Sequence, residues 1–185
     1  MNDTHVKGVA LAHFREFALQ KVGEKGLEEI AATLSPAAAK AFTSPAACDW
    51  YELAAIVEIE HALARRLFNG DETAAAQLGE YDVEESISKV YRILFRLLDP
   101  ATIIKKSGQL WSRFYDRGEV RVELLGPRRA LVHVSGHGPR EEIHCHEIRG
   151  GLLGCIKVCG IKTGKAEHTA CVLKGAPACT YELTW

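Results

Sequence analysis

Hydrophobic and polar positions follow two different periods along the chain, and the change of period divides it into two parts. Up to residue 115, apolar side chains recur every three to four residues, which is the spacing of one face of an α-helix. From residue 119 onward, apolar and polar side chains alternate over short runs, as they do in strands with one buried face. The pattern predicts one domain over residues 1–185, with a helical part (1–115) and a sheet part (116–185).

Capping residues and helix-breaking residues set the expected bounds of the helices. The residues placed to cap helices are Thr4, Ser35, Asp49, Asp82 and Asp99. Gly23 and Gly79 are placed to end helices. In the part up to residue 115 we expect six to seven helices, over residues 5–22, 24–34, 36–43, 50–68, 71–78, 83–98 and 101–115.

The sheet part predicts two hairpins separated by a helix. Residues 120–124 and 130–135 have the alternation of two strands around the turn at Gly126-Pro127. A helix is expected over residues 141–158, followed by strands at residues 165–173 and 178–185. The order of elements, helices then β-β-α-β-β, predicts an α+β fold in which a helical layer packs on a four-stranded antiparallel sheet.

Composition excludes some functions. The chain has 47% hydrophobic and 25% charged residues and a formal net charge of -1, so there is no basic surface for nucleic acid. Residues 1–5 have neither a basic nor an apolar run, so we do not expect a signal peptide, and the sequence has no run of about 20 apolar residues that could span a membrane. We therefore expect a cytoplasmic protein whose cysteines stay reduced, which favours metal or redox chemistry for cysteine clusters.

The segment from residue 144 to the C-terminus contains five of the six cysteines. If the last hairpin is centred on Gly175, Cys171 and Cys179 lie opposite each other, with Cβ atoms about 4.5–5.5 Å apart. Two thiolates at that separation can bind one zinc ion, with His168 as the nitrogen ligand and Cys145 as the fourth ligand. Because residues three apart on a regular strand face opposite ways, this arrangement needs a bulge or strand end between His168 and Cys171.

The same residues also suit roles other than zinc binding. Opposed cysteines can form a disulfide, buried free thiols are common core residues, and a single histidine is often structural. His144 and His146 flank Cys145 and could replace His168 as the nitrogen ligand. Cys155 and Cys159 share one face of the predicted helix, which suits a redox pair or half of a second metal site, although we favour simple packing against the sheet.

The spacing of Cys145, His168-x2-Cys171 and Gly175-x3-Cys179-x-Tyr-x-Leu-x-Trp185 resembles the end of 4-vinyl-reductase domains, including the sensor domains of aromatic-responsive transcription activators. That resemblance implies a structural zinc site. Related domains commonly have Glu where this chain has His168, so three thiolates and one imidazole would fill the zinc coordination sphere here.

Residues 7–30 are similar to the opening of haem-nitric-oxide-binding proteins and of their haem-free relatives. These domains share a superfamily with 4-vinyl-reductase domains and with the small core subunits of Golgi transport protein particles. The resemblance implies that a haem-binding member has an axial histidine after the long central helix and a Tyr-x-Ser-x-Arg motif. Residues 97–102 contain no histidine, and residues 115–121 have the wrong spacing for the motif. We therefore do not expect haem.

Aromatic side chains indicate where a small molecule could bind. Relatives bind apolar molecules between the helices and the sheet, and a pocket there would draw on two predicted helices and one strand. The candidate ligand-binding residues are Tyr91, Phe95, Trp111, Phe114, Tyr115 and His133. The same spacing also suits plain core aromatics, and we favour that simpler interpretation.

Together these features predict a small-molecule-binding or sensor domain with a structural zinc site, which acts on a protein effector or as a homodimer. An enzymatic role in tetrapyrrole vinyl reduction is an alternative that the family name suggests. The glycines at Gly150-Gly151-x2-Gly154 lie within a predicted helix and not after a strand, so they do not form a nucleotide-binding loop. We therefore expect a binding protein more than an enzyme. A scaffold or dimerisation module is the third alternative.

Overall fold

The computed structural model describes residues 3–87, 93–139 and 141–185. A short strand opens the chain, helices dominate as far as residue 114, and two hairpins flank one long helix after that. The elements up to residue 114 are β1 (His5–Lys7), α1 (Gly8–Ala31), α2 (Pro36–Thr43), β2 (Trp50–Glu52), α3 (Leu53–Leu67), the 3-10 helix η1 (Glu72–Ala75), α4 (Ala76–Ser86) and α6 (Pro100–Phe114). The later elements are β3 (Glu119–Gly126), β4 (Arg129–Ser135), α7 (Glu142–Lys157), β5 (Lys165–Ala170), the 3-10 helix η2 (Val172–Lys174) and β6 (Cys179–Thr184).

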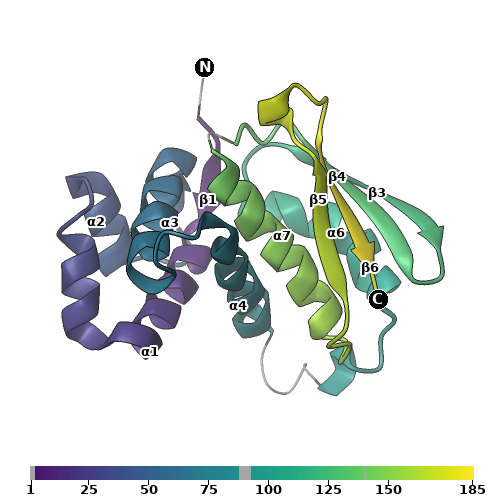
Figure 1. The fold of residues 1–185 in the computed structure, drawn as a ribbon, viewed down its shortest axis with the longest axis horizontal. Helices are drawn as coiled ribbons and strands as arrows, with labels where there is room; N and C mark the ends of the chain where they lie inside the picture. The colour runs from purple at the N-terminus through teal and green to yellow at the C-terminus, as the bar shows by residue number, and fades with distance from the viewer. Residues whose placement is uncertain (1–2, 88–92, 140) are drawn as a thin grey trace.

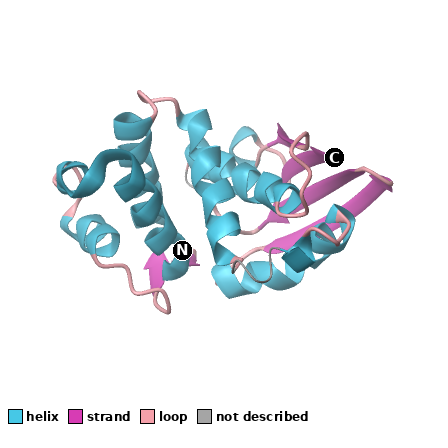
Figure 2. Ribbon diagram, turned by 90° about the horizontal axis from the view of Figure 1, so that it is seen from below, coloured by secondary structure: helices cyan, strands magenta, loops and turns pink. Residues whose placement is uncertain are grey.

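The long helix α7 lies between the helical part and the sheet. Figure 1 shows α1, α2 and α3 on one side of the molecule, the four-stranded sheet on the other, and α4 and α7 between them. The view from below separates the same groups, with the four-stranded sheet at the side opposite the first helices and short strands beside those helices (Figure 2). This arrangement confirms the predicted α+β fold, in which helices pack on an antiparallel sheet.

The sheet has the strand order β3-β4-β6-β5, and every neighbouring pair is antiparallel. Its inner face is apolar because alternate residues of the two central strands are buried: Val132 and Val134 on β4, and Tyr181 and Leu183 on β6. Ile104 of α6, with Ile148 and Ile156 of α7, packs in the same core cluster as these strand residues. The sheet therefore buries one face against α6 and α7.

Two short strands replace the predicted starts of two helices. Residues 5–7 pair with residues 50–52, with Val6 opposite Tyr51, so Thr4 does not cap a helix and α3 begins at Leu53. The Thr4 carbonyl oxygen instead accepts a hydrogen bond from the Leu53 amide, and the Thr4 hydroxyl donates a hydrogen bond to the His137 carbonyl at 2.7 Å. Both helices were predicted to start too early because helical periodicity does not exclude a three-residue strand.

Gly79 does not end a helix, because α4 continues through it to Ser86. Its role is a close approach to α7: a Cβ at residue 79 would lie 2.0 Å from the Glu147 carbonyl oxygen. Gly150 provides the same approach from α7, where a Cβ would lie 1.8 Å from the Ala76 carbonyl oxygen. Asp82 caps no helix and pairs with His13 of α1 at 2.6 Å.

Other predicted boundaries are confirmed. The Ser35 side chain accepts from the Ala38 amide at the start of α2, and the Asp99 carboxylate accepts from the Ala101 amide at the start of α6. Gly23 leaves the helical region with φ of 67° and divides α1 into two segments, as predicted for a break at that residue. Among the described residues, no helix is both long and apolar enough to cross a membrane.

Candidate functional site

Three cysteines and one histidine meet at the junction of α7 with the last hairpin. The ligand atoms of Cys145, His168, Cys171 and Cys179 all lie within 4.8 Å of one another. Cys179 Sγ is 3.9 Å from Cys145 Sγ and 3.9 Å from Cys171 Sγ. Zinc–sulfur bonds of about 2.3 Å in a tetrahedron separate the sulfurs by about 3.8 Å. We call these three cysteines and His168 the thiol cluster. The two sulfur separations match the spacing that zinc coordination requires.

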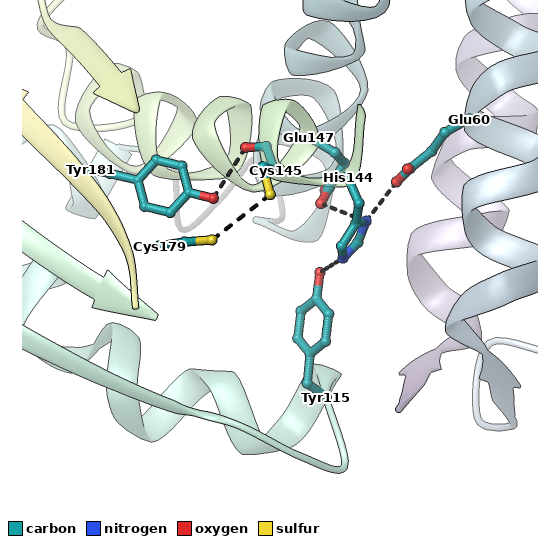
Figure 3. Close-up of polar contacts among 7 residues, drawn as sticks. All are labelled: Glu60, Tyr115, His144, Cys145, Glu147, Cys179 and Tyr181. Atoms are coloured by element: carbon teal, nitrogen blue, oxygen red, sulfur yellow. Dashed lines mark hydrogen bonds and ion pairs between the residues drawn. The ribbon is translucent and has the colours of Figure 1, made fainter. Parts of the chain in front are cut away.

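Local structure brings the four residues together. Cys145 lies in the first turn of α7, and Cys179 opens β6. His168 pairs with Tyr181 across the β5–β6 hairpin, and a register shift between His168 and Ala170 lets Cys171 turn toward the same side. The bulge predicted between His168 and Cys171 therefore exists. Tyr181 also donates its hydroxyl to the Cys145 carbonyl at 3.2 Å, which ties β6 to α7 (Figure 3).

The cysteines of the cluster are free thiols, so the disulfide alternative does not apply to this structure. A hydrogen bond shared with Cys145 lowers the pKa of Cys179 and raises that of Cys145. His137 and His168 further favour the Cys179 thiolate. Within this pair, the surroundings favour the thiolate, the form that binds metals, at Cys179 more than at Cys145.

The histidines around Cys145 have separate places. The His168 ring stacks on Tyr181 with centroids 4.6 Å apart, and His168 Nε2 is buried with no hydrogen-bond partner in the part of the chain that the structure describes. His144 turns away from the thiols toward Glu60, and His146 is outside the group of four ligands. His137 was not predicted from the sequence. It is fully buried close to Cys179, in a loop three residues after Val134, which pairs with Cys179.

A second buried group of polar side chains lies on the other side of the first turns of α7. Glu60 of α3 joins His144 and Glu147 of α7, and their ligand atoms lie within 4.8 Å of one another. His144 Nδ1 lies 2.8 Å from Glu60 Oε1, and its Nε2 lies 3.3 Å from the Tyr115 hydroxyl (Figure 3). We call Glu60, His144 and Glu147 the carboxylate cluster.

Burial changes the acidity of this group. Desolvation raises the pKa of Glu147 to about 8, since a buried carboxylate loses its hydration. Burial disfavours the charged form of His144, but the carboxylates of Glu60 and Glu147 outweigh that effect, and the pKa of the imidazole is raised. Desolvation also raises the pKa of Tyr115 well above its usual range, which keeps the phenol protonated at neutral pH.

The carboxylate cluster was not predicted, although the sequence carries a signal for it. Glu60 is four residues from both Ile56 and Ala64 and therefore lies on the apolar face of α3, where a charged side chain needs a partner. That reasoning indicates a buried partner but does not identify it. His144 is far away in sequence, and only the packing of α3 near α7 brings the two together.

An apolar cavity of about 350 Å³ lies among the helices. Its walls come mainly from α4, α6 and α7, with Val6 of β1 and Ala10 of α1 also lining it. The polar side chains among the lining residues include Asp82, Ser86, Ser107, Tyr115 and Glu147. No residue of the four-stranded sheet is among the described residues that line it. The predicted position, between the helices and the sheet, is therefore wrong, and the cavity lies between helices.

Four of the six predicted ligand-binding residues line this cavity: Phe95, Trp111, Phe114 and Tyr115. Tyr91 lies outside the described residues. His133 is on the outer face of β4, where its Nδ1 lies 3.0 Å from the Thr180 hydroxyl, so it does not reach the cavity. The structure thus gathers the aromatic residues of α6 and separates His133 from them.

The remaining cysteine pair also differs from its expected place. Cys155 lines the helical cavity, and Cys159 packs with Ile103 and Val158, so neither lies against the sheet. Cys159 Sγ lies 3.5 Å from the Cys155 carbonyl oxygen. Desolvation raises the pKa of Cys155 to about 12.

Comparison of the sequence with protein families and with curated proteins gives no match. Comparison of the structure does. An H-NOX protein from S. oneidensis in the Fe(II)NO ligation state superposes with a TM-score of 0.73 at 14% identity, covering 96% of this chain and 97% of that one. The fold is that of H-NOX proteins.

Other H-NOX structures give the same result. Unliganded Fe(II) H-NOX from K. algicida has a TM-score of 0.68 at 11% identity, over 96% of this chain and 95% of that one. H-NOX from Shewanella woodyi in the Fe(II)CO state has a TM-score of 0.69 at 12% identity, over 96% and 93%. The likeness covers nearly the whole chain and is one of fold, because identities this low carry no site residues with them. The 4-vinyl-reductase resemblance has no counterpart among these matches.

The expectation that haem is absent is wrong. The neighbours are iron proteins, and a further one, with a TM-score of 0.69, was solved to study how porphyrin distortion modulates haem redox potential. The expectation rested on the absence of an axial histidine and of the Tyr-x-Ser-x-Arg motif. That absence does not exclude haem, because other residue types can bind its iron. Cysteine thiolate and tyrosine also serve as axial ligands of haem iron, and Cys155 and Tyr115 both line the cavity.

Proposed function

We propose that this chain is a small-molecule sensor domain, in which the helical cavity holds a flat apolar ligand of the haem class and the thiol cluster holds one structural zinc ion. The apolar cavity among α4, α6 and α7, in a chain with the H-NOX fold, is the observation that carries the proposal. Its volume of about 350 Å³ is within the range of small-molecule sites.

The residues around the cavity fit haem. Apolar side chains suit the macrocycle, and Cys155 and Tyr115 are candidate axial ligands, since iron binding would release the proton that burial otherwise keeps on the thiol or the phenol. Lys106 and Arg113 line an adjoining pocket that shares Phe95, Ile103 and Leu110 with the cavity, so cations are available for the propionates. Haem iron, when bound, would supply the binding of a diatomic gas.

Zinc is supported by the donor set of the thiol cluster and the 3.9 Å sulfur separations. Three thiolates and one imidazole leave no open coordination position, so this zinc would be structural. It would fix α7, which also forms one wall of the cavity, to the last hairpin. Elemental analysis of protein made without added zinc, with thiol titration before and after denaturation, tests this part. One zinc and three protected thiols per chain are expected, and a metal-free protein with accessible thiols would contradict it.

Titration with hemin tests the cavity. We expect saturation at one haem per chain with a Soret band, measured by absorbance after removal of free hemin. Cys155→Ala should weaken binding or shift the Soret band if the thiol binds iron, and Tyr115→Phe should do so if the phenol does. Cys159→Ala is the matched control, because Cys159 is one helical turn away and does not line the cavity. Iron-free protoporphyrin IX separates binding of the ring from ligation of iron.

The proposed function fails if neither hemin nor protoporphyrin IX binds. It also fails if binding is unchanged when the cavity is filled by Gly151→Leu, a substitution at a lining residue, provided that circular dichroism shows this variant to be folded. If both single variants retain haem with an unshifted spectrum, Cys155 and Tyr115 are excluded as axial ligands. The cavity would then remain the proposed binding site.

A further inference from the structure

The carboxylate cluster has the composition of a metal site that is separate from the thiol cluster. Glu60, His144 and Glu147 are 0%, 1% and 7% exposed, and they come from two helices that are far apart in sequence. Their ligand atoms lie within 4.8 Å of one another, which is close enough for one ion to contact all three. Figure 3 shows the three side chains converging, while Cys145 and Cys179 meet on the other side of α7.

The hydrogen bonds within the cluster are incomplete. His144 Nδ1 is bonded to Glu60 Oε1, but Glu60 Oε2 and Glu147 Oε2 have no hydrogen-bond partner among the described residues. His144 Nδ1 lies 3.9 Å from Glu147 Oε2, which is too long for a hydrogen bond. A buried carboxylate oxygen without a partner costs free energy, and a cation bound between two such oxygens would offset that cost.

We propose that Glu60, His144 and Glu147 bind a divalent transition-metal ion, such as Fe²⁺, Mn²⁺ or Zn²⁺, through nitrogen and oxygen donors. Two carboxylates and a neutral imidazole carry a charge of −2, which such an ion cancels. Imidazole with carboxylate suits these metals, whereas thiolates select zinc and other soft ions. The two clusters therefore differ in chemistry, although His144 and Cys145 are consecutive in the chain.

Three protein ligands leave at least one coordination position open, as in zinc sites that bind water or substrate. The open side is next to the cavity, because Glu147 and Tyr115 both line it, and the Tyr115 hydroxyl lies 3.3 Å from His144 Nε2. A polar group on a ligand in the cavity could reach the metal from that side. Metal binding here requires neither haem in the cavity nor zinc in the thiol cluster.

Cobalt(II) is the probe that separates the two sites, added to metal-stripped, haem-free full-length protein. Thiolate ligands give Co²⁺ an intense ultraviolet charge-transfer band, and nitrogen and oxygen ligands do not. We expect two Co²⁺ per chain by equilibrium dialysis and elemental analysis, with the charge-transfer band from one of them only. Glu60→Gln and Glu147→Gln should each remove one Co²⁺ and leave the band intact. Cys171→Ser should remove or weaken the band and leave the other Co²⁺ bound.

Glu167→Gln is the control, because this exposed carboxylate of β5 belongs to neither cluster. One Co²⁺ per wild-type chain with a full charge-transfer band would overturn the inference and leave the thiol cluster untouched. Two Co²⁺ that both persist in folded Glu60→Gln and Glu147→Gln would assign the second ion to the surface and overturn it too. A stoichiometry of one Co²⁺ per wild-type chain overturns the inference without any variant, whereas a stoichiometry of two supports it when either folded glutamine variant loses one ion.

Discussion

The thiol cluster and the carboxylate cluster hold the same helix from two sides, but their ligand sets differ. The thiol cluster joins α7 to the last hairpin with four donor groups, enough to fill a tetrahedral zinc site. The carboxylate cluster joins α7 to α3 with three donor groups and borders the cavity. A saturated site can only fix α7 in place, whereas an unsaturated site beside a cavity can respond to what enters it. We therefore expect the thiol cluster, on the sheet side of α7, to determine the stability of the fold. We expect the carboxylate cluster, on the helix side, to determine the response to a ligand in the cavity.

Loss of the thiol cluster should have the largest effect. Structural zinc contributes on the order of 10 kcal/mol to the folding of small zinc-binding peptides, so Cys171→Ser should cost far more than the about 1 kcal/mol of an average substitution. Urea unfolding followed by circular dichroism, with zinc content measured on the same samples, checks this. Cys48→Ser is the control, since Cys48 is exposed and outside the cluster. A Cys171→Ser protein with wild-type zinc and wild-type stability would rule out the zinc site.

Truncation of the carboxylate cluster should have the next largest effect. Glu60→Ala removes the partner of His144 in a fully buried pair, and breaking such a pair costs roughly 3–5 kcal/mol. The measurement is the free energy of unfolding without added metal. Replacing both partners, with Glu60→Met and His144→Phe, should restore part of the stability, because neither residue of the pair is then left unpaired and only the Glu147 carboxyl remains buried among apolar groups. A double variant as unstable as the single one would show that the pair acts through packing alone.

The two clusters also differ in how far the sequence could predict them. The thiol cluster draws three of its members from one hairpin and its flank, so strand geometry alone placed Cys171 near Cys179 and required the bulge after His168. The carboxylate cluster depends on the packing of α3 near α7, which no local spacing encodes. Glu60 could be recognised as a charge on an apolar face, but its partner could not.

The fold shows the same limit. Periodicity predicted the order of the sheet elements and the helix starts at Ser35 and Asp99, because each is determined by residues close together in sequence. It missed β1 and β2, whose pairing joins residues more than 40 positions apart. It also predicted a helix end at Gly79. A glycine is needed at this position because α7 packs too close to leave room for a side chain.

That close approach provides a smaller test of how α7 is held. Gly150→Ala places a Cβ 1.8 Å from the Ala76 carbonyl oxygen, so α4 and α7 must separate, at a cost of about 1–3 kcal/mol. The matched control is Gly151→Ala, whose Cβ would meet its nearest neighbour at 3.8 Å. The thermal unfolding midpoints of the two variants check the prediction. Equal midpoints would mean that α7 is held by the clusters and not by its contact with α4.

The smallest effect is expected at a pair that belongs to neither cluster. His13 of α1 contacts Asp82 of α4 at 2.6 Å, and this hydrogen bond raises the pKa of the imidazole. A raised pKa means that the folded state binds the proton more tightly than the unfolded state. The pair therefore stabilises the protein below the unfolded pKa of about 6.5, by roughly 1 kcal/mol, and the contribution disappears as pH rises through the raised value. Unfolding of wild type and His13→Gln between about pH 5 and pH 9 measures it. The difference in unfolding free energy between wild type and His13→Gln should shrink as pH rises. A difference that grows with pH would mean that a group other than His13 carries the stabilising charge.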